Sequence, residues 1–327
     1  MAHLATKRFS YIGQLAILVG FCGAGMIIGG VASFIPLLGK INIFALAGKS
    51  SDEIMKALLK PEYVSALRWM QFISTLFLFF LPAVFYAWLC HKKAFTHLGY
   101  KHTVDLKEIV IIALIMLACQ PLVSILSDIT EKLPFAKATL QHFKQVEDSY
   151  NSEVEVIAQM KNTGDFIATL FIVALLPALF EETFFRGAVQ NLLSRWFKMP
   201  VLAIVITAAI FSAVHGSYLG FLSRFVLGFI LGWMYYRTGN IWLNIFAHFM
   251  NNGMAVVALY FTSKSSAKID TSQMDEHFPL WMGLLSLIVV YGLFVLFEKV
   301  CKKDINEPGK EVLMEGYDHH NPFANNY

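Results

Sequence analysis

The sequence predicts an all-α membrane protein, a polytopic bundle of about eight transmembrane helices. Of its 327 residues, 57% are hydrophobic and 15% are charged, whereas a soluble domain usually carries about a quarter charged residues. Apolar runs of about 20 residues, long enough to cross a bilayer, recur along the chain. The net charge is only +3 and the basic residues lie in loops. The expected partner is therefore the lipid bilayer, and no nucleic acid is expected.

Eight apolar segments are predicted to span the membrane. The first follows Lys7 and Arg8 and is longer than the apolar core of a signal peptide, which has about 7–15 residues, so we expect it to be retained. The fifth and sixth segments are the shortest. The eight segments are residues 11–34, 69–89, 108–126, 166–186, 200–215, 219–236, 241–261 and 280–298.

Short loops rich in Lys and Arg predict the orientation, because such loops stay on the cytoplasmic side. With eight spans these loops all fall on one side, together with both termini, which are therefore expected in the cytoplasm. The sequence shows no address for an internal membrane, so a bacterial plasma membrane is the expected location. The basic residues concerned are Lys7, Arg8, Lys92, Lys93, Lys101, Lys107, Arg195, Lys198, Arg237, Lys299, Lys302 and Lys303.

Three groups of polar residues lie within the apolar segments, where an ionisable side chain costs at least about 2.5–3.5 kcal/mol. The first group is Glu181, Glu182 and Arg186. Residues four apart share a helix face, whereas adjacent residues point about 100° apart. Glu182 is therefore expected to pair with Arg186, which leaves Glu181 free to act as a general base. A charged helix end at the membrane interface is the alternative interpretation.

The other two groups each contain a histidine. His215 lies four residues after Phe211, so the phenyl ring can pack beside the imidazole. His248 and Asn252 are also four apart, and together they can donate two hydrogen bonds to one point, as a developing oxyanion requires. Such a pair could equally ligate a metal or bond a neighbouring helix.

The order of the segments predicts that these groups lie at one depth. The fourth and fifth spans are expected to turn near Lys198, and Glu181 and His215 are equally far from that turn along the chain. At a rise of about 1.5 Å per residue they reach a similar level. His248 and Asn252 follow the next turn on the same side and lie somewhat shallower, within reach of the other two.

The motifs EExxxR at 181–186, FxxxH at 211–215 and HxxxN at 248–252 resemble, in this order, those of the CAAX-protease and bacteriocin-processing (CPBP, or Abi) family of intramembrane proteases. The likeness covers roughly residues 165–261, and every motif position is present. Motifs of other membrane proteases, namely GxSG, GxSxG, GxGD and HExxH, are absent from the sequence.

The resemblance implies a role for each motif residue. Glu181 would be the general base that activates a water, assisted by His215, and His248 and Asn252 would stabilise the oxyanion. The supporting residues would be Glu182, Arg186 and Phe211. Because the family is commonly described as metalloproteases, a divalent metal such as zinc, with Glu181, His215 and His248 as candidate ligands, stays open as a cofactor.

The sequence therefore predicts an intramembrane endopeptidase that hydrolyses a membrane-embedded or lipidated peptide. The alternatives are a non-catalytic membrane scaffold or regulator of the same fold and a proton-coupled transporter with a Glu/His relay. Residues 1–303 are expected to form one transmembrane domain, with its catalytic core at about 165–261, and residues 304–327 a polar cytoplasmic tail. The amphipathic loop 127–165 is expected to be an interfacial helix, a lid or a solvated connector.

Four further polar residues are expected to lie outside the site. Arg224 could line the site or pair with a carboxylate, but because it is close to the start of its span, snorkelling to the interface is the favoured expectation. Asn251 points about 100° away from Asn252 on a helix. His91 and His97 lie in a basic loop and are expected to be solvated.

Overall fold

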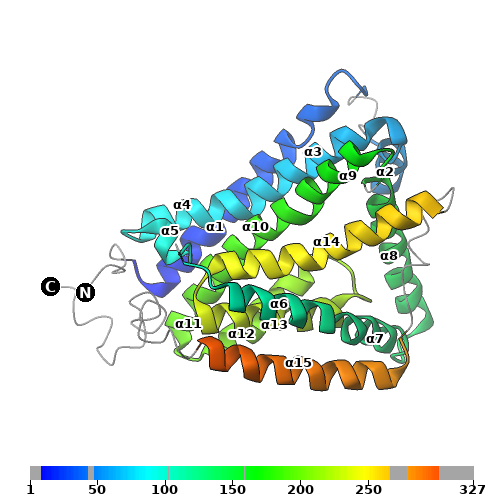
Figure 1. Cartoon of the computed structure of the whole chain (residues 1–327). Helices are drawn as coiled ribbons and strands as arrows, with labels where there is room; N and C mark the ends of the chain where they lie inside the picture. The colour runs from blue at the N-terminus through cyan, green and yellow to red at the C-terminus, as the bar shows by residue number, and fades with distance from the viewer. Residues whose placement is uncertain (1–8, 43–47, 102, 158, 266–277, 302–327) are drawn as a thin grey trace.

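A computed structural model describes residues 9–42, 48–101, 103–157, 159–265 and 278–301. These residues form an all-helical bundle without strands (Figure 1), which confirms the predicted fold class. The basic residues at positions 7, 8, 302 and 303 and the predicted tail 304–327 lie outside the described residues. The predicted division into a membrane domain and a tail therefore stays a prediction.

Each of the eight predicted spans corresponds to helical structure. The spans are α1 (Tyr11–Ala32), α3 with α4 (Val64–Thr75 and Leu81–Cys90), α6 with α7 (Leu106–Ala118 and Gln120–Glu131), α9 with α10 and α11 (Thr163–Thr169, Leu176–Glu182 and Asn191–Phe197), α12 (Pro200–Ala213), α13 (Phe221–Thr238), α14 (Ile241–Ser265) and α15 (Leu280–Cys301). Among the described residues, 6 helices are long and apolar enough to cross a membrane, and α12 is a shorter apolar helix. The chain is an integral membrane protein.

Proline interrupts three of the spans. A proline lacks the backbone N–H and crowds the preceding turn, so a helix that contains one must widen, bend or break. The backbone widens into π-helical turns at Leu76–Phe80 and Leu170–Leu175 and breaks at Cys119. Each irregularity lies one or two residues before its proline. The three prolines are Pro82, Pro121 and Pro177.

The fourth span is longer than the sequence analysis predicts. It runs without a break from Thr163 to Phe197, 35 residues in all, so the expected end at residue 186 is wrong. A second π-helical turn, Thr183–Gln190, follows the two glutamates directly. Lys198 then takes a left-handed conformation, with φ of 55°, and starts the expected turn into α12.

Glycine allows α1 to pack closely on the π-helical turn Leu76–Phe80 of the second span. A Cβ at Gly25 would overlap the backbone carbonyl of Phe77, and one at Gly29 would press on the Phe77 side chain. By contrast, a Cβ at Gly23 on the same helix would meet no atom within 4 Å. Close backbone approach through small residues is the usual way in which membrane helices associate.

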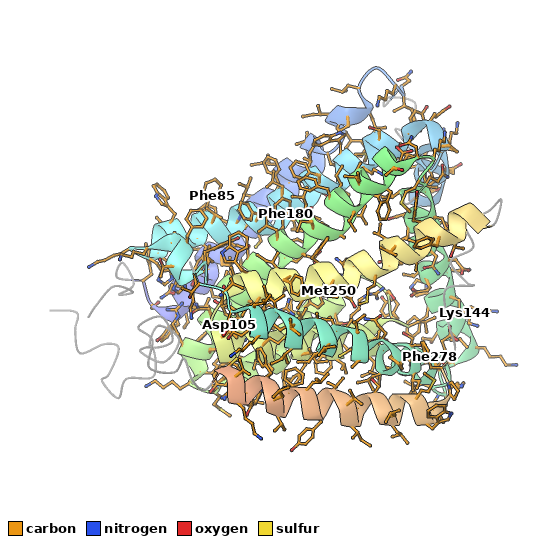
Figure 2. The ribbon with its side chains drawn as sticks, in the orientation of Figure 1. Phe85, Asp105, Lys144, Phe180, Met250 and Phe278 are labelled. Atoms are coloured by element: carbon orange, nitrogen blue, oxygen red, sulfur yellow. The ribbon has the colours of Figure 1, made fainter. Side chains whose placement is uncertain are left out.

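Helix α8 (Lys137–Ile157) crosses the end of the bundle opposite α5 (Ala94–His97), as Figure 1 shows. Ser217 donates a hydrogen bond of 2.5 Å to Glu147 on this helix, and the Phe143 ring stacks on Tyr218 with centroids 4.3 Å apart. Lys144 points away from the bundle in Figure 2. The amphipathic loop is therefore a helix that contacts the bundle along one face and has no buried residue, and the interfacial-helix, lid and solvated-connector interpretations stay predictions.

Two histidines of the loop between α4 and α6 are buried, contrary to expectation. His91 and His97 stack with ring centroids 3.3 Å apart, and both are inaccessible to solvent. The Arg195 guanidinium lies nearby and donates to the side chains of Gln14 and Tyr86, which ties α1, α4 and α11 together. Burial, reinforced by the charge of Arg195, lowers the pKa of His97 well below its ordinary value.

We predict that Gly25→Ala lowers the stability of the protein. The added methyl group forces α1 away from Phe77, and overpacking of this kind costs about 1–3 kcal/mol. The measurement is the apparent unfolding temperature in detergent or nanodiscs, and Gly23→Ala, which adds the same methyl group to open space, is the control. Equal unfolding temperatures for the two variants would contradict the proposed packing.

Candidate active site

The fold brings the three predicted motifs together in the middle of the bundle. Glu181 lies near the midpoint of the 35-residue helix. Helix α12 has 14 residues and is therefore only about 21 Å long, shorter than the hydrocarbon core of about 30 Å. Because α12 is short, His215, two residues beyond its end, lies at the level of Glu181. His248 lies on α14, which contacts α10.

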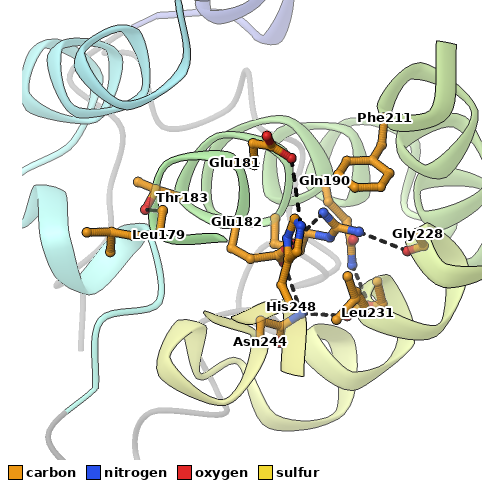
Figure 3. A network of polar contacts seen from close by, with 12 residues as sticks. Leu179, Glu181, Glu182, Thr183, Gln190, Phe211, Gly228, Leu231, Asn244 and His248 are labelled. Atoms are coloured by element: carbon orange, nitrogen blue, oxygen red, sulfur yellow. Dashed lines mark hydrogen bonds and ion pairs between the residues drawn. The ribbon is translucent and has the colours of Figure 1, made fainter. Parts of the chain in front are cut away.

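A fully buried ion pair forms the base of the site. Arg186 Nη1 donates to Glu182 Oε1 at 2.8 Å, and both side chains are 0% exposed. Arg186 Nη2 donates to the backbone carbonyl of Gly228 on α13 at 3.0 Å. Figure 3 shows this network, which joins α10, the following π-helical turn and α13. The predicted pairing of Glu182 with Arg186 is confirmed.

Glu182 also orients His248. Nδ1 of the imidazole lies 2.8 Å from Glu182 Oε1, and since an ionised carboxylate only accepts hydrogen bonds, Nδ1 carries the proton. Asn244 donates to the other oxygen, Oε2, at 3.3 Å and to the carbonyl of Leu231 at 2.7 Å. The sequence analysis missed Asn244, although it lies one helical turn before His248 in an apolar segment.

The backbone of α12 orients His215 so that, as in His248, Nδ1 is hydrogen-bonded and Nε2 faces Glu181. Its Nδ1 lies 2.7 Å from the carbonyl of Phe211, so this nitrogen also carries the proton. The Phe211 ring packs 4.9 Å from the His215 ring, 5.8 Å from the His248 ring and 4.7 Å from the Arg186 guanidinium. Phe211 thus separates the ion pair from His215 and restricts both imidazoles, as expected for a supporting residue.

Glu181 faces both imidazoles and is not paired. Its Oε2 lies 4.0 Å from Nε2 of His215 and 3.9 Å from Nε2 of His248. This oxygen is buried and has no hydrogen-bond partner among the described residues. In the neutral imidazoles both Nε2 atoms lack a proton, so three acceptor atoms face one another. Atoms about 4 Å apart are readily bridged by one water at about 2.8 Å from each.

The same three side chains are the candidate metal ligands. Two ligands of one tetrahedral zinc, each at about 2.1 Å, lie about 3.4 Å apart, which is closer than the observed 3.9 and 4.0 Å. Within the described ranges, no group of three or more His, Cys, Asp or Glu residues is placed to hold a metal ion. The residues as placed therefore fit a water better than a metal.

Asn252 and its neighbour Asn251 both line the cavity at the site. Asn251 Nδ2 lies 3.4 Å from Asn252 Oδ1 and donates to it, which leaves the Asn252 NH₂ group available to a ligand. Gln120 in turn is 3.5 Å from Asn251 Oδ1. The expectation that Asn251 lies outside the site is wrong, because the cavity is wide enough to contact two adjacent positions of α14.

The site opens into a cavity of about 630 Å³. Glu181, His215, His248 and Asn252 line one part of it, and apolar side chains from α3, α8 and α14 line much of the rest. These include Leu67, Met70, Val154, Ile157, Val256 and Leu259. Helix α8 covers the cavity, as a lid would. Arg224 lines the same cavity, as one of the two alternatives to snorkelling predicts, and it packs on Tyr150 of α8 at this end of the bundle.

Comparison with known proteins agrees with the motifs. Residues 163–254 match the family described as Type II CAAX prenyl endopeptidase Rce1-like. The chain thus carries an Rce1-like domain of the CAAX-protease family over this segment, and the predicted family resemblance is confirmed. No solved structure matches the chain significantly.

Two curated relatives are bacterial proteins. An uncharacterised 24.3 kDa protein of Escherichia coli is 34% identical over 92 residues, which are 27% of this chain and 42% of the relative. The uncharacterised protein YpbD of Bacillus subtilis (strain 168) is 30% identical over 115 residues, 34% of this chain and 53% of the relative. The matched segment thus spans about half the length of each relative.

We predict that substitutions of the two adjacent glutamates change the stability of the protein differently. Glu182→Gln leaves Arg186 buried without its counter-ion and is expected to cost about 3–5 kcal/mol. Glu181→Gln removes a buried carboxylate that has no partner and is expected to leave stability unchanged or raise it. Apparent unfolding temperatures of both variants, measured in the same detergent, test this. Equal losses in the two variants would contradict the assignment of the ion pair.

Proposed function

We propose that the protein is an intramembrane endopeptidase that hydrolyses a peptide bond with a water activated by Glu181. The observation that carries this proposal is the buried Oε2 of Glu181, which has no partner among the described residues and faces two imidazole nitrogens at 3.9 and 4.0 Å. A water that donates one O–H to Glu181 Oε2 and the other to Nε2 of His215 would be positioned for general-base catalysis inside an apolar cavity.

In the proposed reaction Glu181 takes a proton from the water as the water oxygen attacks the carbonyl carbon of the substrate. His215 accepts the second O–H of the water through Nε2 and so orients it. The negative charge that develops on the carbonyl oxygen is stabilised by the Asn252 NH₂ group and by His248. Glu181 then returns the proton to the leaving amine, which yields a carboxylic acid and an amine.

His248 can donate to the oxyanion only when Nε2 carries a proton. Because Nδ1 already donates to Glu182 at 2.8 Å, the donating form is the doubly protonated imidazolium. The adjacent Glu182 carboxylate stabilises this cation, much as a carboxylate stabilises the imidazolium of a catalytic triad. The supporting role of Glu182 is therefore electrostatic as well as structural.

The cavity suits a membrane-embedded or lipidated peptide substrate. Its volume of about 630 Å³ lies in the usual range of ligand sites, and most of its lining is apolar. Gln71 Oε1 is buried on the cavity wall without a hydrogen-bond partner among the described residues. An amide oxygen in this position can accept a hydrogen bond from a peptide N–H, which favours an extended peptide over a purely aliphatic ligand.

We further propose a bacterial plasma membrane as the location, with both chain ends in the cytoplasm. The relatives from Escherichia coli and Bacillus subtilis are both bacterial proteins. Among the described residues, Lys92 and Lys93 beside α5 and Lys198 after α11 lie at one end of the bundle (Figure 1), consistent with the positive-inside rule. Helix α8 would then lie on the outer side.

We predict that Glu181→Gln abolishes turnover. Purified protein in nanodiscs is incubated with internally quenched apolar peptides, one set farnesylated on cysteine and one set unmodified. Loss of the general base lowers the rate by about 10²–10⁴. Glu298→Gln, which alters a carboxylate on α15 that contacts Trp233 and Arg237, is the control and should retain activity. Full turnover by Glu181→Gln would rule out the mechanism.

We also predict that removal of divalent metal leaves turnover intact. The separations within the site fit a bridging water better than a metal ion. A chelator is therefore expected to remove nothing that the reaction needs. The test is the rate before and after dialysis against EDTA, with metal content measured in parallel. Activity that disappears on dialysis and returns on addition of zinc would contradict this prediction and assign the three side chains as metal ligands.

A further inference from the structure

Arg224 contributes a positive charge to the cavity that the proposed reaction does not use. It lies in the first turn of α13 and lines the same cavity as Glu181 and His215. Its Nη1 is buried and has no hydrogen-bond partner among the described residues. The guanidinium packs over the ring of Tyr150 on α8, whose centroid is 5.3 Å from Cζ.

No carboxylate neutralises this guanidinium within the part of the chain that the structure describes. Glu147 on α8 is close by but accepts its hydrogen bond from Ser217. Glu153 lines the cavity and makes no ion pair with Arg224, and burial raises the pKa of Glu153, so its negative charge is disfavoured there. Arg224 as a whole is half-buried, but its Nη1 is shielded from solvent, so a ligand that supplies an anionic acceptor to this atom is favoured.

The local backbone makes room for the guanidinium. A Cβ at Gly220 would overlap Arg224 Nη1, because the side chain folds back over this glycine. The φ of Gly220 is −81°, which any residue can adopt. Glycine is therefore needed at this position for space and not for backbone conformation, and the space is occupied by the charged end of Arg224.

We propose that Arg224 binds a carboxylate of the peptide in the cavity and thereby selects substrates that carry an acidic group near the cleaved bond, an inference that rests on the proposed function. A guanidinium matches a carboxylate with two parallel hydrogen bonds. A phosphate dianion fits less well, because Glu181 lines the same cavity and repels a dianion more strongly than the single charge of a carboxylate. The carboxylate is either the C-terminus of the peptide or an Asp or Glu side chain.

The test is peptide binding to the full chain in nanodiscs, measured by fluorescence anisotropy. Three dansyl-labelled apolar hexapeptides are compared: one with a free C-terminal carboxylate, one with a C-terminal amide, and one amidated peptide with a penultimate Asp. The Glu181→Gln variant serves as the background, so that no peptide is consumed. The expected result is binding about tenfold or more tighter for at least one carboxylate peptide than for the neutral amide.

In the same background, Arg224→Gln is expected to abolish this preference and to leave binding of the neutral amide unchanged. Gly220→Ala, which keeps Arg224 but displaces its guanidinium, should weaken the preference as well. The control is Arg237→Gln, which removes the same charge from the other end of α13, where Arg237 lies 3.7 Å from Glu298.

Three results would overturn the proposal: equal binding of all three peptides, equal weakening of all three by Arg224→Gln, or no binding of any peptide. Because no turnover is measured, a failure of the proposed hydrolysis would not affect this readout. Which of the two carboxylate peptides the protein binds more tightly shows whether Arg224 recognises a terminal or a side-chain carboxylate.

Discussion

The ion pair between Glu182 and Arg186 is the interaction on which the site depends. Both side chains are fully buried, and a pair of charges in such a place is stable only if the remaining donors and acceptors are also used. Arg186 reaches the carbonyl of Gly228, and Glu182 accepts from Asn244 and His248. One pair thus connects α10, α13 and α14.

The position of Glu181 follows from this pair. Adjacent residues of a helix point in different directions. Since Glu182 points toward Arg186, the neighbouring Glu181 points toward a different side of the helix. Here that side is the cavity, where the His215 and His248 rings present their Nε2 atoms. Their orientation is determined on the far side of each ring, by the Phe211 carbonyl and by Glu182. Hydrogen bonds to the non-reacting nitrogen commonly fix the tautomer of a functional histidine.

Much of this arrangement could be predicted from the sequence, because it depends on helix periodicity. The pairing of Glu182 with Arg186, the contact of Phe211 with His215 and the common depth of the motifs all follow from residues four apart and from short turns. The π-helical turns could not be predicted in the same way. Two of them precede a proline and depend on how neighbouring helices accommodate it, whereas Thr183–Gln190 has no proline in or directly after it. That third turn lies in the part of the fourth span that extends to Phe197, beyond the expected end at residue 186.

The surroundings of the site were harder to predict for a different reason. Asn251 and Arg224 were expected outside it on the basis of helix direction and distance from the interface. Both expectations treat each helix alone, whereas the cavity lies between several helices, α8 among them, and residues from all of them line it. His97 shows the same effect, since it lies near Arg195, which is far away in the sequence.

The central claim is that both imidazoles carry a proton on Nδ1 and turn Nε2 toward Glu181, with Nε2 of His215 free to accept a hydrogen bond from the water. Solid-state ¹⁵N NMR of protein labelled on histidine, in lipid bilayers, measures the protonation of each ring nitrogen directly. Signals lost in His215→Gln and His248→Gln assign the two rings. The account predicts a protonated Nδ1 in both residues and an unprotonated Nε2 in His215, and a bare Nδ1 in either ring would contradict it.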